Sequence, residues 1–193
     1  MATRTTISIG IAAAFAAFSA SPAFADDGKS TFATNLTGYQ ETTLTLNSPG
    51  SGEFAAKVNR DGTAIQWVLS YRDLPTTVLQ SHIHFGRPGL TGGIVLFLCT
   101  NLGNGPAGAP TPQACPQAPV GGATVTLSGT LTAADVNPQP GQGIAPGAAG
   151  FAAMVAALRN GAAYANVHTE QFKSGEIRGA LGKPQDHGDD DND

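Results

Sequence analysis

Short stretches of alternating apolar and polar residues run through most of the chain, separated by clusters of Gly, Pro, Asn and Ser. Alternation with period two indicates strands with one buried face, and the clusters indicate turns. The clearest hairpin joins strands at 53–58 and 63–71 through Asn59-Arg60-Asp61-Gly62. Further strands are predicted at 31–38, 78–85, 93–98, 124–131, 164–169 and 175–181, of which the apolar run 93–98 is typical of a central strand.

One short helix interrupts this pattern. Apolar residues at 151, 154, 155 and 158 fall at helical spacing, and Gly161 supplies a stop. Several short strands with a single helix predict an all-β fold, an antiparallel sandwich or barrel of Greek-key type. With 25 Gly, 13 Pro and only 12% charged residues, the composition also favours strands and turns.

The sequences at the two ends of the chain differ in character from the alternating pattern between them. Residues 1–25 have the layout of a secretory signal peptide: a basic start at Arg4, an apolar run at 7–18, and Ala23-Phe24-Ala25 as a cleavage site. We expect Sec-type export, cleavage after Ala25, and a periplasmic or secreted location. No other segment is apolar and long enough to span a membrane. A single β domain is predicted at 26–182, followed by an acidic, disordered tail at 183–193.

The charge distribution narrows the choice of partners. The formal net charge is −4, but five aspartates stand between residues 186 and 193, so the folded body is close to neutral. A neutral body offers no basic surface for nucleic acid or anionic membrane, and those partners are set aside.

The only two cysteines, Cys99 and Cys115, flank a segment rich in Gly, Pro and Asn. In an exported protein we expect them to form one disulfide, which for a loop of this length stabilises by about 3 kcal/mol on the chain-entropy model. Their spacing and compartment disfavour the alternative, a thiolate pair on a metal.

Three of the four histidines lie on two alternating strands. His82 and His84 share one face and Ile83 the other, while Tyr164, Asn166 and His168 share a face of the later strand. If the two strands are neighbours, the three imidazoles can meet and bind copper or zinc, with a position left open for water or a ligand. The alternative is a set of half-exposed surface histidines, with His168 hydrogen-bonded to backbone.

Four residues around this cluster are candidates for a supporting role. Tyr164 and Asn166 share the face of His168 and either hold the histidines in place or are ordinary strand residues. Glu176 and Arg178 flank an apolar residue on the last strand. Either Glu176 orients a histidine or adds a ligand, or the two residues form a surface ion pair worth under about 1 kcal/mol, which we favour.

A set of short motifs follows one another along the chain: the stretches 36–41, 82–86, 92–95, 164–169 and 175–179, together with Gly52 and the strand that follows. In this order they resemble the CHRD domain, which occurs in chordin and in many bacterial exported proteins. The resemblance implies a compact β domain outside the cytoplasm but brings no settled activity. Ala165 and Ala180 depart from the family pattern, standing where a larger residue is usual, and the cysteine loop looks like a local insertion.

Three functions remain open. The favoured one is an exported binding module that holds a transition metal, copper before zinc, at His82, His84 and His168. The second is a metal-free structural or protein-interaction domain with an extracellular or periplasmic partner. The third is a three-histidine metalloenzyme with redox or hydrolytic activity, ranked lower because the sequence offers no clear general base. A serine-nucleophile elbow and a phosphate-binding loop are both absent from the sequence.

Overall fold

The computed structural model describes residues 30–182. The predicted signal peptide and acidic tail, and with them the cleavage site, lie outside the described residues. The strands are β1 (Thr31–Thr37), β2 (Ser51–Val58), β3 (Ala64–Arg72), β4 (Val78–Phe85), β5 (Gly93–Thr100), β6 (Val125–Thr132), β7 (Ala163–Thr169) and β8 (Ile177–Leu181). Helix α1 (Gly147–Arg159) and the short 3₁₀ turns η1 (Gly38–Gln40), η2 (Ala133–Asp135) and η3 (Pro140–Gln142) complete the elements.

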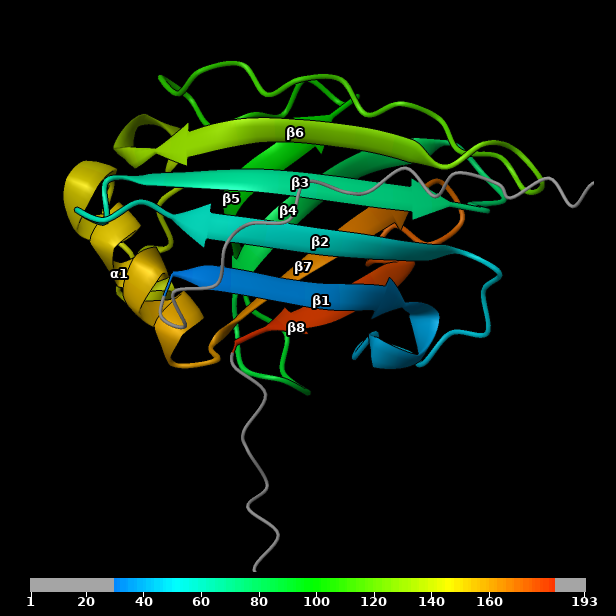
Figure 1. Cartoon of the computed structure of the whole chain (residues 1–193), viewed down its shortest axis with the longest axis horizontal. Coiled ribbons are helices and arrows are strands. Elements are labelled where there is room, and N and C mark those ends of the chain that lie inside the picture. Colours follow the sequence, from blue (N-terminus) through cyan, green and yellow to red (C-terminus); the bar gives the residue numbers. More distant parts are fainter. Residues whose placement is uncertain (1–29, 183–193) are drawn as a thin grey trace, which may run out of the picture.

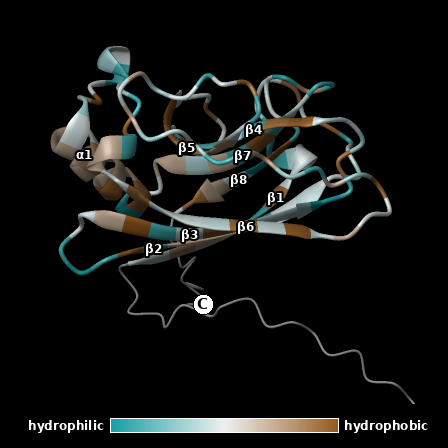
Figure 2. Ribbon diagram, turned by 90° about the horizontal axis from the view of Figure 1, so that it is seen from above, coloured by the Kyte–Doolittle hydropathy of each residue, from teal (hydrophilic) through white to brown (hydrophobic). Residues whose placement is uncertain are grey.

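The strands form one antiparallel sheet that folds over into two layers. Its order is β5-β4-β7-β8-β1-β2-β3-β6, so the last strand lies beside the first. β1, β2, β3 and β6 form the near layer in Figure 1, with β4, β5 and β7 crossing behind them. The two layers are seen edge-on in Figure 2, where α1 lies at one end. The all-β antiparallel sandwich or barrel with one helix is therefore confirmed.

Apolar side chains fill the space between the layers because alternate residues of each strand point inward. Phe32 and Leu36 of β1 are buried as predicted, and so is Ile83 of β4. Phe54 stacks on Trp67 across the predicted hairpin, with ring centroids 6.5 Å apart. The predicted helix is also confirmed, and its apolar stripe, including Met154 and Leu158, packs on the same core.

The prediction that 93–98 is a central strand is wrong. β5 is fully apolar over Val95–Leu98, yet it stands at one end of the strand order. Its outer edge is covered by the bridge between Leu96 and Val136, and Asn137 donates its backbone N–H to the Val95 carbonyl. A continuous apolar run indicates that both faces of a strand are buried, but it does not show that the strand has a neighbour on each side. In β5 the free edge is covered by residues 136 and 137 instead of by another strand.

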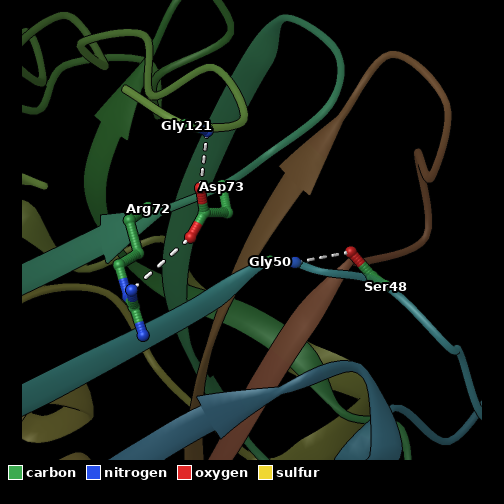
Figure 3. A network of polar contacts seen from close by, with 5 residues as sticks. All are labelled: Ser48, Gly50, Arg72, Asp73 and Gly121. Carbon is green, nitrogen blue, oxygen red and sulfur yellow. Dashed lines mark hydrogen bonds and ion pairs between the residues drawn. The ribbon is translucent and has the colours of Figure 1, made fainter. Parts of the chain in front are cut away.

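The predicted disulfide is present: Cys99 and Cys115 are bonded, with their Cα atoms 5.1 Å apart. Beyond the loop that it closes, the segment that leads to β6 is held by Asp73, whose carboxylate accepts the Gly121 backbone N–H at 2.8 Å and lies 3.6 Å from the Arg72 guanidinium (Figure 3). Asp73 has a φ of 56°, a conformation that Asp tolerates better than most residues. The turn after β3 is thus tied to the segment before β6.

Candidate metal centre

The two histidine-bearing strands are neighbours, as the three-imidazole hypothesis requires. β4 pairs with β7 in a register that sets His82 opposite Asn166, His84 opposite Tyr164, and Gln80 opposite His168. Residues opposite one another project to the same face of a sheet. His82, His84 and His168 therefore share one face, and each offers a ring nitrogen within 4.8 Å of those of the others.

This spacing is close to that of a loaded site. Two nitrogens bound to one ion at about 2 Å lie at most about 4 Å apart, so small side-chain movements would close the cluster on a metal. The ring centroids are 5.0 Å apart for His82 and His168 and 5.5 Å apart for His82 and His84. The structure thus brings together all three histidines named from the sequence.

The histidines are buried, so the alternative of half-exposed surface rings is wrong, although the backbone hydrogen bond that it predicted for His168 is present. His82 is 0% exposed, and His84 and His168 are each 5% exposed. The reason is that loop backbone closes over the sheet face: the Gly92 carbonyl oxygen lies 2.9 Å from His84 Nδ1, and the Lys173 carbonyl oxygen lies 2.9 Å from His168 Nδ1.

These two carbonyls fix the tautomers of the rings that they contact. A carbonyl oxygen can only accept, so Nδ1 of His84 and Nδ1 of His168 must each carry the proton and donate it. In the neutral rings, Nε2 is then an unprotonated lone pair. Metal-binding histidines are commonly held in this way, with the nitrogen that does not bind donating to a backbone carbonyl.

Both lone pairs converge on Asn166. Its side-chain oxygen Oδ1 lies 3.0 Å from His84 Nε2 and 3.1 Å from His168 Nε2. An oxygen acceptor facing two nitrogen acceptors is unfavourable. The arrangement becomes favourable if the amide turns over, so that its NH₂ donates to both rings, or if a cation binds to the nitrogens.

His82 has no such partner. Neither of its ring nitrogens makes a hydrogen bond, although the ring is fully buried and packs edge-on against Phe97. Burial, followed by the neighbouring His168 and His84, lowers the pKa of His82 well below its ordinary value of 6.5, so the ring is neutral. An unsatisfied buried polar group costs about 1–3 kcal/mol, and a bound metal would remove part of that cost.

The other two rings are also neutral at physiological pH. Burial lowers the pKa of His84 to about 4, although its bonds to Gly92 and Asn166 oppose the shift. Burial likewise lowers the pKa of His168, against the effect of its bond to the Lys173 backbone. Coordination needs neutral imidazole, so the cluster is in the protonation state that a metal requires.

Tyr164 and Arg178 extend the cluster on one side. The Tyr164 ring stacks on His84 with centroids 4.5 Å apart and planes 8° from parallel. The Arg178 guanidinium carbon lies 3.4 Å from the centre of the Tyr164 ring, and Arg178 donates to Thr42 Oγ1 and to the Leu90 carbonyl, both at 2.7 Å. The buried Arg178 guanidinium therefore packs on the Tyr164 ring, which in turn stacks on His84.

The predicted surface ion pair between Glu176 and Arg178 is wrong. Both side chains are buried, and among residues 30–182 the ion pair found is Arg72–Asp73. The Glu176 carboxylate instead accepts the hydroxyls of Ser48 and Thr169, at 2.5 and 2.6 Å. Ser48 also accepts the Gly50 backbone N–H (Figure 3). The loop before β2 and the last residue of β7 supply these two partners, which strand alternation alone does not reveal.

Sequence reasoning missed Glu41, which is 6% exposed and has one carboxylate oxygen, Oε1, without a partner. Burial raises the pKa of Glu41 to about 7, while the charge of Arg178 and a hydrogen-bonding interaction with Asn166 lower it. Glu41 stands in the stretch 36–41 that carries the family resemblance. Nothing in the alternation marks it as buried.

Three neutral imidazoles on one face suit copper or zinc, because both bind imidazole nitrogen well. Within the described part of the chain, no carboxylate or further histidine joins this group. The cluster therefore offers three protein ligands and resembles sites that keep a position open for water or substrate.

The profile of the CHRD domain matches residues 32–181. The chain belongs to the CHRD domain family, as the resemblance indicated. No curated protein and no solved structure matches the chain. Between residues 30 and 182, no helix is long and apolar enough to cross a membrane.

Proposed function

We propose that this protein is an exported CHRD-type binding module that holds one transition-metal ion at His82, His84 and His168. Copper is favoured over zinc as that ion. Its role is storage, delivery or sensing of the metal. Export rests on the signal-peptide layout of residues 1–25 and on the extracellular type of the family.

The observation that carries the proposal is the state of His82. Its two ring nitrogens have no hydrogen-bond partner at 0% exposure, beside two rings whose Nε2 lone pairs converge on Asn166. A hydrogen-bonded structural cluster would satisfy all three rings. A metal ion uses one lone pair from each, which matches the atoms left without donors.

Copper is favoured over zinc on affinity grounds. Divalent affinity for nitrogen sites rises to Cu²⁺ and falls again at Zn²⁺. Imidazole ligands suit both ions, and the cluster contains no thiolate that would favour zinc or Cu⁺ over Cu²⁺. The bonded cysteines, Cys99 and Cys115, provide no free thiolate.

The metal-free alternative has one observation in its favour. If the Asn166 amide turns over, its two N–H groups satisfy His84 and His168 without any metal. The rings are then structural, and the domain acts by binding another protein. This reading leaves His82 unsatisfied, and for that reason we rank it second. A metalloenzyme ranks third because the cluster holds no carboxylate to act as a base.

Calorimetric titration tests the proposal. The chain from Asp26 to Asp193 is titrated with Cu²⁺ and with Zn²⁺, next to a His82→Ala/His84→Ala variant and a His187→Ala control that removes the histidine outside the cluster. We expect one equivalent to bind tightly to the wild type and to the control, and binding to be lost in the double variant. Binding that survives in the double variant, or that disappears in the control, overturns the proposal.

A further inference from the structure

A cleft of about 600 Å³ lies between the segments 41–46 and 170–175. Most of the residues that line it are exposed or half-buried, but Glu41 and Gly175 are buried. Two carboxylates line the cleft: Glu41 in its buried part and Glu170 at the surface. A cation that enters from solvent would thus meet an exposed carboxylate and then a buried one.

The buried part of the cleft adjoins the histidine cluster through two connections. The Glu41 carboxylate interacts with Asn166, whose Oδ1 touches both His84 and His168. Lys173, which also lines the cleft, holds the ring of His168 through its backbone carbonyl. One side chain, Asn166, therefore separates Glu41 from the histidines.

Glu41 has one carboxylate oxygen that makes no hydrogen bond. Its Oε1 has no hydrogen-bond partner although the side chain is 94% removed from solvent, being 6% exposed. A Cβ added at Gly175 would lie 2.3 Å from this oxygen, so only glycine fits there. Buried carboxylate oxygens are normally satisfied, and one left free beside a cleft has the chemistry of a cation ligand.

Aromatic rings cover other parts of the cluster. Tyr164 packs on His84, with the Arg178 guanidinium over the Tyr164 ring, and Phe97 packs on His82. The guanidinium also acts on Glu41, because its charge lowers the pKa of that carboxyl and it donates to the neighbouring Thr42. The cleft is lined by the carboxylates of Glu41 and Glu170 and by the exposed Lys173, so an oxygen ligand for a cation is found there and not among the aromatic rings.

We propose that this cleft is the path by which the metal reaches the histidines, with Glu41 as a relay that binds the ion first and passes it on. The inference rests on the metal-binding function proposed above. The ion exchanges water for the Glu41 carboxylate, then exchanges that carboxylate for the imidazoles as the Asn166 side chain moves aside. The metal keeps its oxidation state, and the imidazoles are neutral. The Glu41 carboxyl, with its pKa of about 7, gives its proton to water where it is protonated when the ion binds, and can take a proton back when the ion moves on.

Stopped-flow kinetics test the relay. Quenching of Trp67, the only tryptophan, follows Cu²⁺ loading of the chain from Asp26 to Asp193, and a chelator chase follows release. A relay speeds both directions, so Glu41→Gln should slow loading and release together by about tenfold or more, the range in which focused charge changes rates. The affinity should stay within about twofold of wild type, because the histidines are intact. Glu170→Gln, in the same cleft but exposed, is the matched control and should change both rates by less than about twofold.

A second variant works by size alone. Ser174→Leu places a bulky side chain in the lining of the cleft on an exposed residue, so the fold should be retained, and it leaves Trp67 as the only tryptophan for the fluorescence signal. It should slow loading and release as Glu41→Gln does. Unchanged rates in both variants overturn the relay while leaving the metal site standing. Faster release from Glu41→Gln also overturns it, since that result makes Glu41 a holding group. Absence of stoichiometric binding to the wild type overturns the proposed function itself.

Discussion

His82 lies directly opposite Asn166 in the pairing of β4 with β7, yet the two do not hydrogen-bond. Asn166 instead reaches the two other histidines, at 3.0 and 3.1 Å, and His82 is left with both nitrogens unpartnered. On the same buried face, two rings thus donate to backbone carbonyls and share Asn166, while the third ring has no hydrogen-bond partner.

A His82→Leu variant should be more stable than the wild type without metal. The change removes a buried polar ring that makes no hydrogen bond and replaces it with an apolar side chain beside Phe97. We expect the free energy of unfolding to rise by about 1 kcal/mol, while Cu²⁺ no longer raises the melting temperature. Denaturant unfolding with and without the metal measures both effects.

The matched control for this change is His84→Leu, which should destabilise the metal-free domain. His84 donates to the Gly92 carbonyl and stacks on Tyr164. Its loss leaves that carbonyl with only the long hydrogen bond from the Tyr164 hydroxyl, at 3.4 Å. Removal of the His84 hydrogen bond should cost about 1 kcal/mol. If His82→Leu destabilises the domain as much as His84→Leu does, His82 has a structural role that its contacts do not show.

The metal-free domain should lose stability as the pH falls from about 6.5 towards 4. Burial lowers the pKa values of His82, His84 and His168 in the folded chain, with that of His84 at about 4, against 6.5 for an ordinary histidine. Below pH 6.5 the three histidines bind protons in the unfolded chain but stay neutral in the folded chain until the pH falls further. Each histidine therefore adds a slope of up to about 1.4 kcal/mol per pH unit.

Glu41 acts in the opposite sense. Its folded pKa of about 7 exceeds the ordinary 4.5, so its contribution favours folding at low pH and is lost as the pH rises through 7. It offsets one of the three histidines between pH 4.5 and 6.5 and leaves a net positive slope. Chemical denaturation across this range measures the slope, which should be steeper in Glu41→Gln and shallower in His82→Leu. A flat profile would contradict neutral, buried histidines.

The alternation that places the histidines could be predicted from the sequence, because period two is a local property of any strand. It put His82 with His84 and placed Tyr164, Asn166 and His168 together. What joined the two sets was the pairing of β4 with β7, whose register follows from packing across the sheet and which no local pattern contains. From the sequence, the meeting of the three histidines depended on the two strands being neighbours, and the structure shows that β4 and β7 are paired.

Loop contacts account for what sequence reasoning missed. The carbonyls of Gly92 and Lys173 set the histidine tautomers, and backbone groups leave no mark in a side-chain pattern. Glu41 and Glu176 are buried because loops fold over the sheet face, whereas composition places a carboxylate at the surface. The same covering explains why β5, at the end of the strand order, is as apolar as a central strand.

Arg178→Ala should destabilise the domain strongly. Arg178 stacks on Tyr164 and ties two loops together through Thr42 and Leu90. Loss of a desolvated cation–π contact and two hydrogen bonds from a charged group predicts a fall of about 3 kcal/mol in the free energy of unfolding. Arg72→Ala is the control: its ion pair with Asp73 is 3.6 Å long and its side chain 59% exposed, so little change is expected. Equal effects of the two variants would contradict the structural role of Arg178.

A Cys99→Ser/Cys115→Ser variant should lose about 3 kcal/mol of stability, the value for a loop of this length on the chain-entropy model. Metal affinity should be kept, because in the pairing of β4 with β5 His82 lies opposite Phe97 and His84 opposite Ile94, both outside the loop that the disulfide closes. Thermal unfolding and copper titration of the variant check the two halves of this prediction. If a folded variant loses copper binding, the loop closed by Cys99 and Cys115 contributes to the metal site, which would contradict the prediction.

X-ray absorption at the copper edge is the most direct test of the central claim. It is measured on the chain from Asp26 to Asp193 loaded with one equivalent of Cu²⁺, and on the His82→Ala/His84→Ala variant. The account predicts imidazole scattering from three histidines with nitrogen at about 2.0 Å, absent from the variant. An oxygen-dominated shell without imidazole, unchanged in the variant, would contradict the three-histidine site and place copper elsewhere on the protein.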